Sequence, residues 1–173
     1  MTLEWAGRYH ALVEEIIFMA NGYSGIRSRE IFQTDPPCSP EQIQVLQYLL
    51  AHEEEQQNMK SIADMLGMTK SAFTKLIAGL EGNGLIDKYH TQSNRKNIVL
   101  RVSEEGRALY DQYVELYGRR IFGSFFDMGN GLSDKALERV TAMIHELNQN
   151  YSFQKANEVS LKEPLIKVER PNR

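Results

Sequence analysis

The sequence predicts a mainly helical fold with one small β-hairpin, an α+β arrangement in which long terminal helices flank a central unit. Three observations support this prediction. Apolar residues recur at helical spacing over much of the 173 residues. Two short runs rich in strand formers lie at 85–90 and 97–102. Glycine and proline clusters, such as the run at 35–40, separate the elements.

Composition and motifs exclude several classes of protein. The single cysteine, Cys38, cannot form an intramolecular disulfide or a multi-cysteine metal site. A reactive thiol and a disulfide between subunits are both still open as alternatives. No apolar run approaches the roughly 20 residues of a membrane span, so we expect a cytoplasmic protein without a membrane partner. Because the four histidines are scattered and no phosphate-binding glycine loop or HExxH motif occurs, we expect no enzyme, no metal and no cofactor.

Charge is distributed unevenly along the chain. The net charge is -3, yet residues 60–101 hold seven basic and three acidic side chains and so carry +4. The rest of the chain carries -7. A basic centre between acidic flanks is expected when one region meets phosphate and the others do not.

Helical spacing and start signals define the first two helices. Apolar residues from Trp5 to Ala20 form one stripe, and two glycines then weaken the pattern. Ser39 is placed as an N-cap, with Pro40 at the first position and Gln42 completing a capping box. The second helix should run to about His52, and the run Glu53-Glu54-Glu55-Gln56-Gln57 after it should form a solvated turn, called the acidic turn below.

A helix-turn-helix follows in the middle of the chain. The run Ser61-Ile62-Ala63-Asp64 has a capping-box pattern and predicts a short helix that stops at Gly67. Thr69 should cap the next helix, which ends at Gly82-Asn83-Gly84. A helix, a glycine turn and a second helix are typical of a DNA-binding helix-turn-helix.

The rest of the chain predicts a hairpin and two long helices. The hairpin has a basic tip at Arg95 and Lys96. Ser103 and two glutamates open a helix to about Asp127, and Ser133 caps a last helix that ends near residue 151. We therefore divide the chain into an N-terminal dimerisation helix and linker (1–38), a DNA-binding unit (39–102), C-terminal dimerisation helices (103–151) and a partly mobile tail (152–173).

The stripes of the terminal helices are too long and apolar for a small central unit to cover, so we expect a two-fold homodimer. The alternative is that these helices cover only their own domain. The side chains expected in the dimer interface are Trp5, Tyr9, Leu12, Ile16, Val140, Ile144, Leu147 and Tyr151.

The outer face of the predicted helix at 69–81 carries short hydroxyls and lysines, which suit contacts with phosphates and base edges. An ordinary solvated face is the alternative, but a second basic element at the hairpin tip favours DNA. A protein-interaction module without specific DNA binding is the rival function, and salt dependence separates the two. The residues expected to bind double-stranded DNA are Lys60, Ser61, Thr69, Lys70, Ser71, Thr74, Lys75, Asn94, Arg95 and Lys96.

The ordered motifs at 62–71, 80–86, 93–97 and 102–106 resemble the MarR family of winged-helix transcriptional regulators. The resemblance implies a winged helix-turn-helix, repression of transcription by a dimer on a pseudo-palindromic operator, and Arg95 as the wing arginine. The chain departs from the pattern at Ser93, where the family has an aspartate. The acidic turn is also longer than the pattern, and the tail after Ser152 lies outside it.

The same resemblance implies a small aromatic effector, bound between the dimerisation helices and the winged helix. Phe18, Tyr23, Phe32 and Tyr110 are candidates for lining such a pocket. Aromatic residues at helical spacing are more often part of a core, and this alternative stays open for all four.

Overall fold

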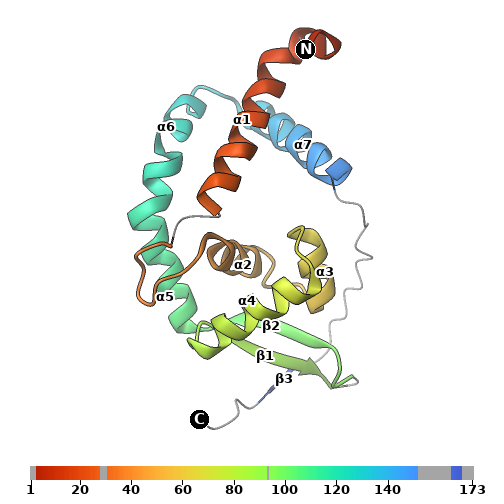
Figure 1. The fold of residues 1–173 in the computed structure, drawn as a ribbon, viewed down its shortest axis with the longest axis vertical. Coiled ribbons are helices and arrows are strands. Elements are labelled where there is room, and N and C mark those ends of the chain that lie inside the picture. The colour runs from red at the N-terminus through yellow and green to blue at the C-terminus, as the bar shows by residue number, and fades with distance from the viewer. Residues whose placement is uncertain (1–2, 28–30, 93, 152–164, 169–173) are drawn as a thin grey trace.

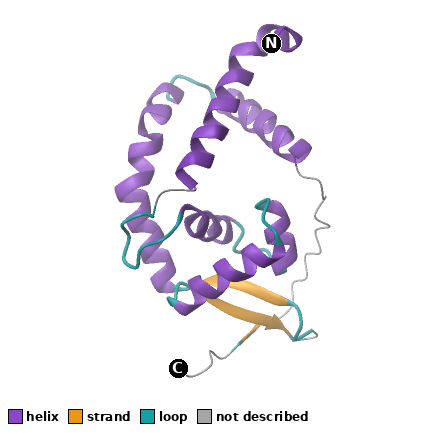
Figure 2. Cartoon of the chain, in the orientation of Figure 1, coloured by secondary structure: helices purple, strands orange, loops and turns teal. Residues whose placement is uncertain are grey.

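The computed structural model describes residues 3–27, 31–92, 94–151 and 165–168 (Figure 1). Helices dominate, and one three-stranded antiparallel sheet lies at one end of the molecule (Figure 2), so the predicted fold class is confirmed. In chain order the elements are η1 (Leu3–Tyr9), α1 (His10–Arg27), α2 (Pro40–Ala51), α3 (Met59–Met65), α4 (Lys70–Gly82), β1 (Ile86–Thr91), β2 (Ile98–Val102), α5 (Glu104–Tyr113), the π-helical turn η2 (Val114–Gly118), α6 (Arg119–Gly129), α7 (Asp134–Tyr151) and β3 (Leu165–Lys167).

The central unit contains the hydrophobic core. All buried hydrophobic residues of the described chain lie between Phe32 and Leu109. Helix α2 contributes four of them and α4 and β2 three each, and Phe73, Ile77 and Leu80 of α4 face inward. The opposite face of α4 is thereby left to solvent, as the spacing of its apolar residues predicts.

Three predicted helix caps are confirmed. The Ser39 hydroxyl accepts a hydrogen bond from Gln42 N, and the Gln42 side chain accepts from Ser39 N, so the capping box is complete. Thr69 caps α4 by accepting from Ala72 N at 3.2 Å. Ser103 caps α5 by accepting from Gly106 N at 3.0 Å. Each cap satisfies an amide that the first helical turn cannot pair internally.

The predicted start of α3 is wrong by about three residues. Asn58 is the N-cap, and its side-chain oxygen accepts from Ser61 N at 2.9 Å. Asn58 also forms an isolated antiparallel bridge with Val99 of β2. This pairing holds Asn58 in extended backbone, so the helix begins there and Ser61 falls inside its first turn.

The hairpin is confirmed, and the sheet has a third strand that the sequence analysis missed. Strands β1 and β2 pair from Ile86 with Val102 to His90 with Ile98. Strand β3 comes from the segment treated above as a tail and pairs with the other edge of β1. The remaining tail residues lie outside the described part of the chain.

The N-terminal helix is longer than the sequence pattern suggested, whereas α7 ends at Tyr151 as predicted. Gly7 has a positive φ of 53° and bends the start, so that η1 precedes α1. Helix α1 then continues through both glycines that were expected to weaken it. Helices α5 and α6 form one rod, because the backbone at both ends of η2 keeps right-handed helical dihedrals. No helix of the described residues is long and apolar enough to cross a membrane.

Candidate nucleic-acid interface

Helix α4 presents a polar outer face. Lys70, Ser71, Thr74 and Lys75 are exposed, while the opposite side of the helix is buried in the core. The Thr74 hydroxyl donates to Lys70 O at 2.8 Å, and its oxygen can still accept a hydrogen bond. Thr69 serves as the cap of this helix and is itself exposed.

Helix α3 adds a second basic position beside α4. It contacts both α4 and β2, and buried Ile62 and Ala63 fix it against the core. Lys60 is exposed on its first turn. Ser61 is half-buried, and its hydroxyl lies 3.3 Å from the Asn58 side-chain oxygen, so it supports the cap of α3 more directly than it offers a free contact.

The tip of the hairpin holds the remaining predicted contacts. Asn94, Arg95 and Lys96 are exposed. The Asn94 side-chain oxygen accepts from Lys96 N at 3.0 Å, and Asn94 O accepts from Asn97 N at 3.0 Å and from the buried Thr91 hydroxyl at 3.3 Å. Asn94 therefore shapes the turn that carries Arg95. Ser93 lies outside the described residues.

The cations of the central segment fall into two groups. Lys88 is paired with Glu81 at 2.6 Å, and Lys167 of β3 is paired with Asp87 at 2.6 Å. In the part of the chain that the structure describes, the other group forms no ion pair with a carboxylate and is exposed: Lys60, Lys70, Lys75, Arg95 and Lys96. An unpaired lysine or arginine is free to displace counterions from phosphate.

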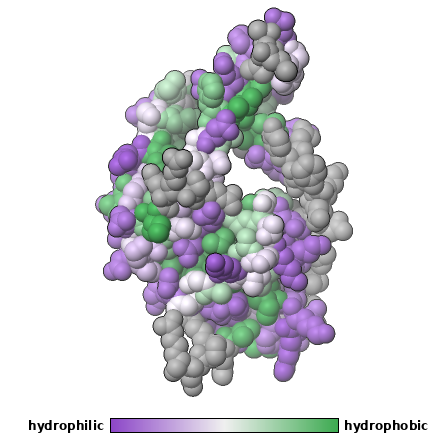
Figure 3. All heavy atoms as spheres, in the orientation of Figure 1, coloured by the Kyte–Doolittle hydropathy of each residue, from purple (hydrophilic) through white to green (hydrophobic). Residues whose placement is uncertain are grey.

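These unpaired cations gather at one corner of the molecule. Helix α3, the adjoining end of α4 and the hairpin tip lie on the same side in Figure 1, and hydrophilic side chains cover that corner in Figure 3. Among the described residues, no group of three or more histidine, cysteine, aspartate or glutamate side chains is placed to hold a metal ion.

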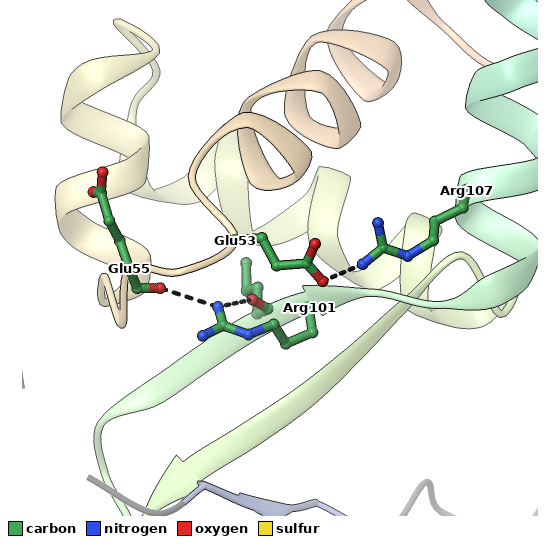
Figure 4. Close-up of polar contacts among 5 residues, drawn as sticks. Glu53, Glu55, Arg101 and Arg107 are labelled. Atoms are coloured by element: carbon green, nitrogen blue, oxygen red, sulfur yellow. Dashed lines mark hydrogen bonds and ion pairs between the residues drawn. The ribbon is translucent and has the colours of Figure 1, made fainter. Parts of the chain in front are cut away.

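The acidic turn after α2, to which the sequence analysis gave no role, is tied to β2 and α5 (Figure 4). Glu53 forms an ion pair with Arg107 of α5. Arg101 of β2 donates to the main-chain oxygen of Glu55 at 3.1 Å. Burial lowers the pKa of Arg101, and the nearby Glu53 and Glu54 carboxylates oppose this shift. The turn thus connects the helix before the helix-turn-helix to the two elements behind it.

A second exposed surface is apolar and follows the terminal helices. Trp5 is 78% exposed and Val140 is 48% exposed. Tyr9 and Leu12 are exposed as well, whereas Ile16, Ile144 and Leu147 are half-buried. The side chain of Tyr151 is outside the described set. Green hydrophobic patches over α1 and α6 are visible in Figure 3.

The sequence analysis placed α6 within the C-terminal dimerisation helices but named none of its side chains in the dimer interface. Phe122, Phe125 and Phe126 are exposed, and Phe125 reaches 67%. The rings of Phe122 and Phe126 stack with centroids 6.1 Å apart, and no residue of α6 is buried. The aromatic far end of this helix was visible in the sequence, and its spacing of three and four residues was the signal that could have placed it on the apolar surface.

The candidate effector residues do not share one environment. Phe32 belongs to the core and packs against Tyr113 and Tyr117, with ring centroids 5.0 and 4.8 Å away. Tyr110 also contacts Tyr113. Phe18 and Tyr23 on α1 are 58% and 45% exposed.

Burial raises the pKa of Tyr113, and the nearby Tyr110 and Tyr23 hydroxyls add to the shift. Three of the four candidates, Tyr23, Phe32 and Tyr110, therefore surround Tyr113, a residue that the sequence analysis did not single out.

The central segment is similar to a known protein family. Residues 38–98 match the model of the MarR family. A search of curated proteins finds no match. The crystal structure of the transcriptional regulator SlyA is similar, with a TM-score of 0.57 and 21% identity over 82% of this chain and 94% of that chain.

Two further structures have the same fold. MepR of S. aureus in its DNA-binding conformation gives a TM-score of 0.54 and 20% identity over 65% of this chain and 80% of that chain. A MepR-like protein complexed with pseudoligands gives 0.55 and 15% identity over 86% and 99%. At these identities the likeness concerns the fold alone. The winged-helix fold and the resemblance to the MarR family are therefore confirmed.

Proposed function

We propose that this chain, whose residues 38–98 match the MarR family, is a transcriptional regulator that binds double-stranded DNA as a homodimer in the cytoplasm. The observation that carries the proposal is the separation of charge. The cations that face the sheet edge or the acidic turn are paired, whereas five cations on α3, α4 and the hairpin tip are exposed without a carboxylate partner in the described chain.

The shape of this corner suits a duplex. A helix such as α4, anchored by one buried face, can enter the major groove with Lys70, Ser71, Thr74 and Lys75 directed at phosphates and base edges. Arg95 at the hairpin tip can then reach the adjacent minor groove, where the potential is more negative. Lys60 on α3 is placed for a backbone phosphate, a contact that positions the protein without reading sequence.

The apolar surface supports the dimer. Side chains of α1, α6 and α7 that are exposed in one chain would be covered by the same surfaces of a second copy, which is a closed two-fold solution. Two copies would present two α4 helices to successive major grooves of a pseudo-palindromic site, about 34 Å apart.

Repression with release by a small aromatic effector is the finer part of the proposal. Tyr113, with Tyr23 and Tyr110 near it, lies where α1 and the loop after it meet the rod formed by α5 and η2. Two hydrogen bonds join that loop to the rod: Gln33 N donates to the Tyr117 hydroxyl, and Asp35 N donates to the Gln112 side chain. A phenolic compound bound there would contact both the terminal helices and the central unit. Release of the DNA-bound protein from its operator by such a compound would support this part.

Salt-dependent titration of duplex DNA tests the DNA-binding role. The operator is first isolated by selection from genomic fragments with the purified protein. Lys75→Ala and Arg95→Ala should each weaken binding, and each lost phosphate contact should reduce the salt slope by about 0.9. Lys135→Ala, which removes an equally exposed cation from α7, is the matched control and should leave the slope unchanged.

The rival function, a protein-interaction module, predicts a different result. If the protein binds no duplex more tightly at low salt than at high salt, the proposal fails. If Lys135→Ala weakens binding as much as Lys75→Ala, net charge alone accounts for the affinity and the α4 face has no special role.

Light scattering at micromolar concentration tests the dimer. Val140→Glu places a carboxylate on a side chain that is half-exposed in one chain, so the subunit should still fold. In a dimer the same carboxylate would be buried without a partner, which is strongly disfavoured. Gln149→Glu adds the same charge at an exposed position of α7 and is the control. A monomer mass for the unmodified protein would refute the assembly.

A further inference from the structure

We infer that β3, contributed by the C-terminal segment, is a positioning element for the hairpin tip and so for DNA binding. This inference rests on the proposed function. Residues 165–167 pair only with the distal half of β1, from Tyr89 with Lys167 to Thr91 with Leu165. Thr91 is the last residue of β1 before the tip that carries Arg95 and Lys96.

The distal half of the hairpin is the part that needs support. At its proximal end, Ile86 of β1 is fully buried in the core. At the distal end, Thr91 is buried opposite β3, His90 and Ile98 are half-buried, and the tip residues are exposed. A two-stranded ribbon is marginal in water, and a third strand makes it considerably more stable.

Both backbone and side chain hold β3 in place. Val168 N donates to Lys88 O at 2.7 Å, and Lys167 Nζ lies 2.6 Å from an Asp87 carboxylate oxygen. The Asp87 side chain is 12% exposed and that of Lys167 is 55% exposed, so the pair is shielded from solvent on the Asp87 side only. The segment therefore has one ionic and one main-chain attachment beside the β-ladder.

The pairing register of β1 allows the docking of β3 to be followed by amide hydrogen exchange. Neighbouring residues of a strand direct their amides to opposite edges. Because Lys88 O accepts from β3 and Leu85 O accepts from Ser103 N, Lys88 and His90 face β3, whereas Asp87 and Tyr89 face β2. Release of β3 should expose the amide of His90 to hydrogen exchange and leave those of Asp87 and Tyr89 protected.

Ile166→Pro is the first test. Ile166 pairs with His90, and proline removes the amide that faces β1 without changing the charge. The variant should lose protection at His90 and bind the operator about tenfold more weakly, since the tip must then be ordered on DNA. Ile166→Val keeps the amide and is the control.

Asp87→Lys is the second test, and it separates positioning from net charge. It raises the net charge by two, so simple attraction to phosphate predicts tighter binding. Release of β3 by repulsion of Lys167 predicts weaker binding. The exchange Asp87→Lys with Lys167→Asp keeps the original net charge and should restore both amide protection and affinity.

The outcomes distinguish the two proposals. If the unmodified protein binds no duplex, the proposed function fails, and amide exchange still reports whether β3 docks. If the unmodified protein binds its operator and Ile166→Pro exposes His90 without loss of affinity, the positioning role is overturned. Tighter binding by Asp87→Lys, or an unprotected His90 amide in the unmodified protein, overturns it as well.

Discussion

Replacement of Gly106 by alanine should destabilise the central unit strongly. Gly106 is buried in the first turn of α5, directly after the cap at Ser103. A Cβ atom there would lie 2.7 Å from Val102 Cγ1 and 3.0 Å from the main-chain carbon of Leu85, with the Leu85 oxygen closer still. That oxygen also accepts from Ser103 N at 3.1 Å, so it cannot move away without loss of the bond that joins β1 to α5.

Two opposing effects set the size of the change. Alanine favours a helix over glycine by about 1 kcal/mol. Overpacking of a well-packed site costs about 1–3 kcal/mol, and the upper end applies here because the obstacle is backbone and not a flexible side chain. We therefore expect a net loss of roughly 2 kcal/mol, which lowers Tm by about 4–8 °C for a chain of this size.

Urea unfolding and thermal scans at one fixed protein concentration measure this loss. The concentration is held constant because association shifts apparent stability by mass action. Gly123→Ala is the matched control, since its added Cβ meets nothing within 4 Å in α6 and should be neutral or slightly stabilising. Equal urea midpoints for Gly106→Ala and the unmodified protein would refute the packing argument.

Three further predictions concern the caps and the buried titratable groups. Thr69→Ala should cost about 1 kcal/mol in urea unfolding and Thr69→Ser almost nothing, because serine keeps the hydroxyl that accepts from Ala72 N and alanine does not. Equal losses would contradict the cap. Burial raises the pKa of Tyr113, so its stabilisation is complete below the unfolded pKa of about 10 and is lost as pH rises through the folded pKa. Tyr113→Phe should therefore lose less stability between neutral and alkaline pH than the unmodified protein, and an unchanged pH profile would argue against this cause. The Cys38 side chain is 0% exposed, and burial raises the pKa of its thiol. A thiol reagent should therefore label Cys38 slowly in buffer and quickly in urea. Fast labelling of the folded protein would contradict this prediction and would favour a redox role for Cys38.

The elements that the sequence predicted best are those with a local cause. The capping box at Ser39 and the cap at Thr69 need only residues within one helical turn. The hairpin follows from two strand-forming runs separated by a short polar segment. In each case the pattern and the tertiary packing agree, so no long-range contact had to be known.

The errors arose where a distant partner decides the structure. Asn58 and Ser61 are both good caps, and the bridge from Asn58 to Val99 selects the first. Strand β3 is three residues long and pairs with residues more than seventy positions earlier, which no local pattern reveals.

The candidate site likewise combines residues that local spacing predicted with contacts that only the folded chain brings together. The predicted basic residues of α3, α4 and the tip are all exposed, as their spacing required. The use of Asn94 in the turn and the ties from the acidic turn to Arg101 and Arg107 depend on contacts across the fold. The apolar spacing of α6 was available in the sequence, but its exposure became clear only from the structure.

The confinement of the buried core to residues between Phe32 and Leu109 has a consequence during synthesis. Helix α1 emerges from the ribosome before the central unit, and its apolar side chains remain in contact with water while the central unit is made. Once Leu109 has emerged from the ribosome, that unit has all its buried hydrophobic residues, and α6 and α7 have not yet emerged. The exposed apolar side chains of α1 would therefore stay uncovered while the central unit is made, so a homodimer of the proposed kind could begin to form between two chains that are still being synthesised.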